Sequence, residues 1–226
     1  MIPFLHLLSL PAASAAGWCA SSEAAVQHTM EEISAAVGAG SCKQAARRLA
    51  RSRSLDLTDS GLTDLRPLHD APVEILLLGR NQLTDISTLE TMGSLRWLDL
   101  SGNPLADLSP LSEAPKLETL WLGDTEVEDI GPLSGLSSLR SLGIGGTPVS
   151  SVEALRGLSL SYLGLGGSQV QDLRPIRRMK SLKALDVSGI PVDPGLCPVK
   201  AATEIRYKCI EIREASGWQA DPSTGG

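Results

Sequence analysis

Residues 95–138 read LRWLDLSGNPLADLSPLSEAPK and then LETLWLGDTEVEDIGPLSGLSS, two lines with one pattern at a spacing of 22 residues. Each line opens with L-x-x-L-x-L, places Asn103 or Thr125 three residues later, and closes on Pro-Leu shortly after an Asp. A fixed period between about 20 and 29 residues with this pattern indicates a leucine-rich repeat. The stretch therefore predicts stacked coils that bury their leucines against one another.

The same pattern recurs in seven registers, which start at residues 52, 73, 95, 117, 139, 160 and 182. The first register lacks its opening Leu, and the last loses the pattern after Val192. Such atypical ends are expected, because an end unit has a neighbour on one side only. We predict an α/β solenoid with short parallel strands on its concave face, 3₁₀ or short-helix returns, and a cap at each end.

The pattern divides the 226 residues into five segments. We predict a signal peptide at 1–16, a helical N-terminal cap at 17–51, repeats at 52–193, a C-terminal cap at 194–212 and a flexible tail at 213–226. The first segment has an apolar run followed by Ala13-Ser14-Ala15, which resembles a secretory cleavage site, although it lacks the usual basic residues. The alternative is an apolar leader that packs on the cap.

Two capping-box patterns in the N-terminal segment, at Thr29 and at Ser41, predict a helix start at each. The first helix would turn Met30, Ile33 and Val37 inward, and the second would turn Ala45, Ala46 and Leu49 inward. Arg47, Arg48 and Arg51 at the end of the second helix suit the negative end of its dipole, so we expect them to be solvated.

Four cysteines flank the repeats, at positions 19, 42, 197 and 209, and none forms a Cys-x-x-Cys motif, so a zinc site is not indicated. Three pairings are possible. Nearness along the chain favours Cys19–Cys42 and Cys197–Cys209 if the protein is exported, since disulfides persist in oxidising compartments. The alternative is four free thiols in a cytosolic protein.

Two polar columns accompany the leucines. The turn after each strand carries Ser60, Asn81, Asn103, Thr125, Thr147, Ser168 and finally Ile190, and we expect the polar members to hydrogen-bond the neighbouring coil. The column ends on an apolar residue, as if the last coil needed no downstream partner. A second column holds Asp64, Asp85, Asp107, Asp129 and Asp172, with Ser151 in place of one Asp. Calcium binding is one interpretation, but a turn or cap role at the start of each return segment is favoured.

Composition argues against several classes of function. The net charge is −6 and the basic residues form no stripe, which disfavours nucleic acid as a partner. No stretch approaches the apolar length of a membrane span. His6, His28 and His69 have no nucleophile beside them, and the Gly-rich stretches at 143–146 and 164–167 fall on repeat positions without completing a phosphate-binding motif. We expect no enzyme activity, no cofactor and no metal.

The repeats resemble the 22-residue class of bacterial internalins, which a eukaryotic phosphatase-1 regulator shares. Residues 95–111 match their pattern L-x-x-L-x-L-x-x-N-x-I-x-D-I-x-P-L almost position by position. Trp18-Cys19, Thr29 and Cys42 are similar to the N-terminal module of exported bacterial repeat proteins, and Cys197-Pro198 with Cys209 resembles their C-terminal cap. The resemblance implies a protein-binding solenoid without catalysis. The later Thr/Ser turns depart from the pattern, and the chain shows no anchor motif or Ig-like domain after Cys209.

The candidate binding residues lie at the third and fifth strand positions, which face away from the leucines because strand side chains alternate. The third positions are Ser54, Ile75, Trp97, Thr119, Ser141, Tyr162 and Ala184, and the fifth are Asp56, Leu77, Asp99, Trp121, Gly143, Gly164 and Asp186. We predict one exposed apolar patch of Ile75, Leu77, Trp97 and Trp121, flanked by Arg80, Asp99 and Asp124. Beyond it, the glycines would leave bare backbone, with Tyr162 standing alone.

Two alternatives for this patch stay open: the cap or leader folds over it, or the indole rings only stack on each other. The favoured function is an exported, surface-associated or periplasmic module that is monomeric and binds a protein on its concave face. The rival is an intracellular scaffold or regulatory subunit resembling the phosphatase-1 regulator, with free thiols.

Overall fold

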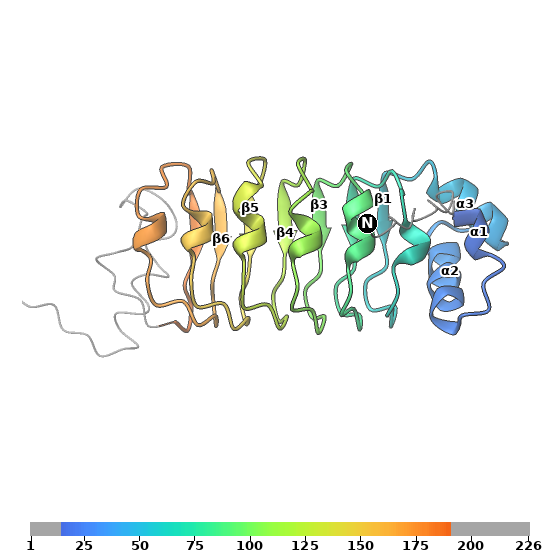
Figure 1. Cartoon of the computed structure of the whole chain (residues 1–226), viewed down its shortest axis with the longest axis horizontal. Coiled ribbons are helices and arrows are strands. Elements are labelled where there is room, and N and C mark those ends of the chain that lie inside the picture. Colours follow the sequence, from blue (N-terminus) through green and yellow to red (C-terminus); the bar gives the residue numbers. More distant parts are fainter. Residues whose placement is uncertain (1–14, 191–226) are drawn as a thin grey trace, which may run out of the picture.

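The computed structural model describes residues 15–190, which form an elongated solenoid with helices at its N-terminal end (Figure 1). Within these residues, seven strands form one parallel sheet in chain order. They are β1 (Ser54–Asp56), β2 (Ile75–Leu77), β3 (Trp97–Asp99), β4 (Thr119–Trp121), β5 (Ser141–Gly143), β6 (Tyr162–Gly164) and β7 (Ala184–Asp186). The predicted repeat fold and its strand positions are confirmed, and every strand pairs with the next at equivalent repeat positions.

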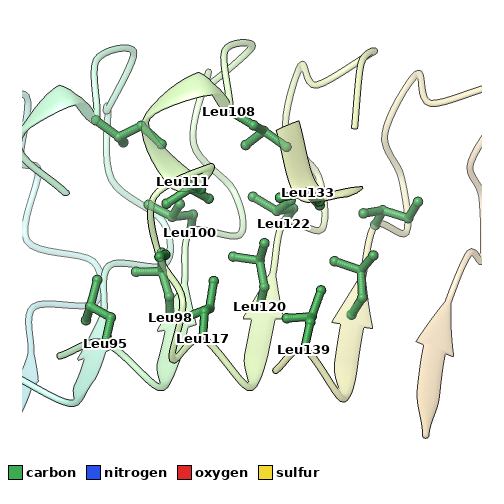
Figure 2. Close-up of a cluster of buried hydrophobic side chains, with 14 of the residues drawn as sticks. Leu95, Leu98, Leu100, Leu108, Leu111, Leu117, Leu120, Leu122, Leu133 and Leu139 are labelled. Atoms are coloured by element: carbon green, nitrogen blue, oxygen red, sulfur yellow. The ribbon is translucent and has the colours of Figure 1, made fainter. Parts of the chain in front are cut away.

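The leucines of the pattern form one continuous core between the strands and the return segments. Leu98, Leu100, Leu120 and Leu122 are completely buried, and Figure 2 shows such side chains from successive coils stacked beside one another. Each strand is only three residues long, because the chain must turn as soon as its leucines have entered the core. The stack of coils therefore supplies the burial that no single repeat could provide.

Within residues 15–190, six 3₁₀ helices form the returns, as predicted, and four of them carry a Pro in their first turn. They are η1 (Arg66–Leu68), η2 (Ser87–Thr91), η3 (Ser109–Leu111), η4 (Gly131–Gly135), η5 (Glu153–Leu155) and η6 (Arg174–Ile176). The Asp column caps them. In each case Oδ1 accepts the N–H two residues later, as from Asp107 to Ser109 at 2.8 Å and from Asp129 to Gly131 at 2.7 Å. Ser151 accepts the Glu153 N–H in the same way, so the predicted turn or cap role at the start of each return is confirmed.

The turn column links coils in only part of its length. Asn81 accepts from the N–H groups of Ser60 and Leu62, which belong to the preceding coil. Thr125 and Thr147 instead donate to carbonyl oxygens of their own coils. We expected Ile190 to be apolar because no coil follows it. That explanation is wrong, because the asparagine side chains bond to the preceding coil, which Ile190 also has.

The N-terminal cap consists of α1 (Ala15–Trp18), α2 (Ala24–Ala36) and α3 (Cys42–Leu49). Ser41 caps α3 through the Gln44 N–H, as predicted. The predicted start at Thr29 is wrong, because α2 begins at Ala24 and Thr29 lies inside it. The Thr29 hydroxyl instead lies 2.7 Å from the carbonyl oxygen of Asp64 and 3.0 Å from that of Ala25, so it joins the cap helix to the first repeat.

Several further contacts fasten the cap. The disulfide Cys19–Cys42 joins α1 to the start of α3, with Cα atoms 5.6 Å apart, in agreement with the predicted pairing. Arg66 of η1 pairs with Asp64 and with Glu23, and its guanidinium lies 5.7 Å from the ring centroid of Trp18. Arg48 donates to the carbonyl oxygens of Val37 and Gly38, so it closes the end of α2. The cap thereby covers the apolar edge of the first coil.

Some predictions fall outside the described residues. These are most of the signal segment, the Cys197–Cys209 pair, the C-terminal cap at 194–212 and the tail at 213–226. The five segment boundaries stay predictions. Within residues 15–190, every helix is too short to cross a membrane.

Candidate functional site

The concave face carries two columns of side chains that point away from the leucine core. Register places Trp97 beside Ile75 on one side and Thr119 on the other, and it places Asp99 between Leu77 and Trp121. The four apolar residues of the predicted patch thus come from three consecutive strands, β2, β3 and β4.

Two members of that patch are strongly exposed. Ile75 is 41% exposed and Trp97 is 42% exposed, and among residues 15–190 these are the large hydrophobic side chains on the open surface. Leu77 and Trp121 are half-buried. The described cap does not cover Trp97, which leaves a large apolar side chain exposed to water.

Trp121 is turned toward the C-terminal end of the face, where its ring meets Tyr162 edge-on at a centroid distance of 5.4 Å. The ring lies over Gly143 of the intervening strand, where a Cβ would collide with it. Tyr162 likewise lies over Gly164, at 3.0 Å from the position of a Cβ. The expectation of an isolated Tyr162 is therefore wrong, and so is that of bare backbone at Gly143 and Gly164, which are buried under aromatic rings. Gly146 and Gly167 in the following turns are exposed.

The predicted flanking charges occupy different places. Asp99 lies within the apolar patch, half-buried, and its Oδ1 accepts the Ser101 N–H at 2.9 Å. Arg80 and Asp124 lie three residues beyond their strands, in left-handed turn conformations with φ of 57° and 56°. Their side chains rest against Gly102 and Gly146 of the next coil. These two charges thus form the carboxyl-end rim of the patch.

A row of alternating charge forms the opposite rim, and the sequence analysis did not single it out. Arg53 pairs with Glu74 at 3.2 Å, and Arg96 pairs with Glu118. Each of these residues directly precedes a strand, so the row crosses the amino ends of β1 to β4. The sequence does contain a signal for this rim, because the charges of these four residues alternate in sign at the repeat spacing. An apolar centre between two polar rims is the usual anatomy of a protein-binding surface.

Comparison with known proteins supports the architecture. The Leucine Rich Repeat family matches residues 94–113. The crystal structure of internalin C2 from Listeria monocytogenes is similar, with a TM-score of 0.67 and 27% sequence identity over 76% of this chain and 78% of that one. This chain is an internalin-like leucine-rich repeat solenoid.

Two further comparisons concern a second solved structure and the curated proteins. A second Listeria monocytogenes structure, that of an internalin named inlF, has 19% identity and a TM-score of 0.47 over 78% of this chain and 74% of that one. Comparison with curated proteins gives no match.

Two histidines, His28 and His69, lie within residues 15–190, and each contacts an oxygen of the chain. The Nε2 of His28 lies 2.7 Å from the carbonyl oxygen of Ser60, which ties α2 to the first turn. The Nδ1 of His69 lies 3.1 Å from a carboxylate oxygen of Asp70. Within residues 15–190, no group of three His, Cys, Asp or Glu side chains is arranged to hold a metal ion.

Basic residues gather on the return side of the last described coils, which the sequence analysis did not anticipate. A cleft of about 760 Å³ is lined by Arg156, Arg174, Arg177, Arg178 and Lys180, together with smaller and apolar side chains. Arg156 pairs with Glu153 and Arg174 pairs with Asp172, so two of these five charges are already neutralised. The acidic residues of the internalin-like solenoid lie mostly upstream, with sixteen acidic against six basic residues in 52–155.

Proposed function

We propose that this chain is an exported, non-catalytic module that binds a protein partner on its concave face. The observation that carries the proposal is the exposure of Trp97 and Ile75 side by side on β3 and β2. Burying such side chains fully contributes about 1.5–3 kcal/mol each, so a partner that covers them gains affinity. Trp is also among the residues most enriched at the energetic centres of interfaces.

The surroundings of Trp97 support a protein partner in particular. Ile75, Leu77 and Trp121 extend the apolar surface across three strands, and the charged rims of Arg80, Asp124 and the Arg96–Glu118 pair border it. Tyr162 adds an aromatic group at the C-terminal side through its contact with Trp121. Since strands and turns rather than mobile loops carry these groups, the surface is pre-organised and little entropy is lost on binding.

Export is supported by the Cys19–Cys42 disulfide, because such bridges persist in oxidising compartments. It is supported as well by the apolar segment and Ala13-Ser14-Ala15 motif at the start of the chain. Thiol titration of protein isolated from its own cells, with and without reductant, separates this proposal from an intracellular regulator. Titratable thiols without reductant at Cys19 and Cys42 would favour the intracellular alternative.

The binding face is tested by site-specific photo-crosslinking in the native host. A photoreactive amino acid replaces Trp97 in one variant and Ser134, which is exposed in η4 on the return side, in the control variant. We expect one protein to crosslink at position 97 and not at position 134. Crosslinking confined to position 134, or none at position 97 while the partner still co-purifies, contradicts a concave binding face.

A further inference from the structure

Asp99 is an acidic side chain in the middle of the apolar patch. It shares the concave face of β3 with Trp97, two residues earlier, and register places Leu77 and Trp121 on its two sides. Its side chain is half-buried. Apolar neighbours remove water from a carboxylate without replacing the hydration that a charge requires, so such a group gains from a cation brought close to it.

No cation of the described chain fills that role. Within residues 15–190, the partner of the Asp99 carboxylate is the Ser101 N–H, and no guanidinium or ammonium group pairs with it. Two arginines of the rims take other positions. Arg96 pairs with Glu118, and the Arg80 side chain lies against Gly102.

The acidic excess of the repeats also favours a positively charged partner. Residues 52–155, which contain β1 to β5, carry sixteen acidic and six basic residues, so this part of the solenoid has a net negative charge. A negative surface attracts and orients a positively charged partner before contact. The Asp99 carboxylate, two residues after Trp97 on β3, is then a specific group for the attracted cation to bind.

We propose that this face recognises a basic side chain of the partner, which docks on Asp99 beside Trp97. Arginine suits the place better than lysine, because its planar guanidinium stacks on aromatic rings and donates two hydrogen bonds to one carboxylate. An apolar side chain of the same partner segment covers Ile75 and Leu77. The proposal rests on the concave binding face proposed above, and it adds the chemistry of the bound segment.

An Asp at this strand position can also serve only to accept a hydrogen bond from the following turn, as Asp56 does. Asp56 occupies the same strand position in β1 and accepts the Thr58 N–H at 3.0 Å, but it has no Trp two residues before it. The test must therefore measure binding as well as folding. Asn in place of either Asp keeps an oxygen that accepts the turn N–H and removes the charge, so D99N and D56N form a matched pair.

The probe is a phage-displayed library of random peptides, selected on the full chain and then screened against the W97A, D99N and D56N variants. We expect the clones that lose binding to W97A to be enriched in Arg or Lys. These clones should lose about 10-fold in affinity on D99N, the size of one desolvated charge contact, and bind D56N like the wild-type protein. Replacing the peptide's basic residue by Ala should cost the wild-type protein the same factor and cost D99N little, because both changes remove one contact.

Each contrary result has a distinct meaning. Clones that depend on Trp97 but lack basic residues, or that bind D99N as tightly as the wild-type protein, overturn the basic-side-chain inference and leave the concave face standing. A library that yields no Trp97-dependent clone counts against the basic-side-chain inference and the concave face together. If D99N and D56N lose peptide affinity equally and both have lowered melting temperatures, Asp99 acts only in the turn, and the inference is overturned.

Discussion

Two asparagines hold neighbouring coils together, whereas the threonines that replace them serve their own coils. The amide of Asn103 accepts the Leu83 N–H and donates to Leu78 of the preceding coil and to Leu100 of its own. The Thr125 hydroxyl donates to Leu122 within its coil. The repeat pattern predicts a polar residue here, but it does not tell on which side the amide finds its partners, since both coils offer free backbone groups.

This difference should appear in stability. Asn103→Ala leaves buried backbone groups of two coils without their partner, so we expect a loss of about 1–3 kcal/mol in the free energy of unfolding. Thr125→Ala removes a single donor, and we expect a loss of about 1 kcal/mol or less. Urea unfolding of both variants at one pH measures the contrast. Equal losses would show that the link between coils adds nothing.

The exposure of Thr119 could not be predicted from the repeat pattern. Alternation places it on the outer face of β4, yet it is only 8% exposed. It lies beside Trp97 in register and two residues before Trp121, so its neighbours on this face include two large side chains. The columns of the candidate site follow from the period, but the exposure of each member depends on how neighbouring rings turn. Trp121 turns toward Gly143 and Tyr162, a packing that the pattern alone does not specify.

Leu120 and Thr119 test the inward and outward assignment. Leu120→Ala leaves a cavity in the middle of the stack and should lower the free energy of unfolding by about 2–5 kcal/mol. Thr119→Ala should cost more than the roughly 0.5 kcal/mol of a surface change, because the side chain is covered, and less than Leu120→Ala. Thermal and urea unfolding check the order, and a larger loss for Thr119→Ala contradicts the register.

At the scale of the element, the return segments depend on their Asp caps. Hydrogen bonds from the Ser109 side chain and backbone lower the pKa of Asp107 from its ordinary value of 3.8. The Arg174 side chain and backbone lower the pKa of Asp172 in the same way. Asp at the start of I/L-x-P-L was predictable, because the residue type and the following proline act locally. The start of α2 was not, since Thr29 belongs to a contact with the first repeat that no local pattern reveals.

The caps make a signed prediction about pH. Because the folded-state pKa values lie below those of the unfolded chain, the unfolded state takes up protons first on acidification. The stabilisation is present above about pH 4 and is lost as the pH falls through the lowered folded values. Below about pH 4, the free energy of unfolding of Asp107→Asn should therefore depend less on pH than that of the wild-type protein. Near neutrality, the two free energies should change with pH to the same extent. A steeper acid dependence in the variant would reverse the sign of the argument.

At the scale of the whole molecule, the solenoid is a one-dimensional stack whose first coil needs a cover. In such a stack each coil is stabilised by its neighbours, so the loss of a cap exposes the core at one end and unfolding spreads from there. The α-helical cap supplies that cover through the Thr29 contact with Asp64, through Arg66 and through the disulfide. The sequence indicated a cap because the repeat stops before residue 52, and the cysteine spacing indicated its bridge.

Removing the bridge should loosen this end while the remaining coils stay folded. Cys19 and Cys42 are 23 residues apart, and a cross-link over such a loop typically stabilises by about 2–4 kcal/mol. We expect the double variant C19S/C42S to lose that amount in urea unfolding. Amide exchange should accelerate first in α2, α3 and β1 and last in β4 and β5, since protection falls from the middle of the stack toward an uncovered end. Uniform acceleration along residues 15–190 would mean that the stack unfolds as one unit and that the cap does not control its first coil.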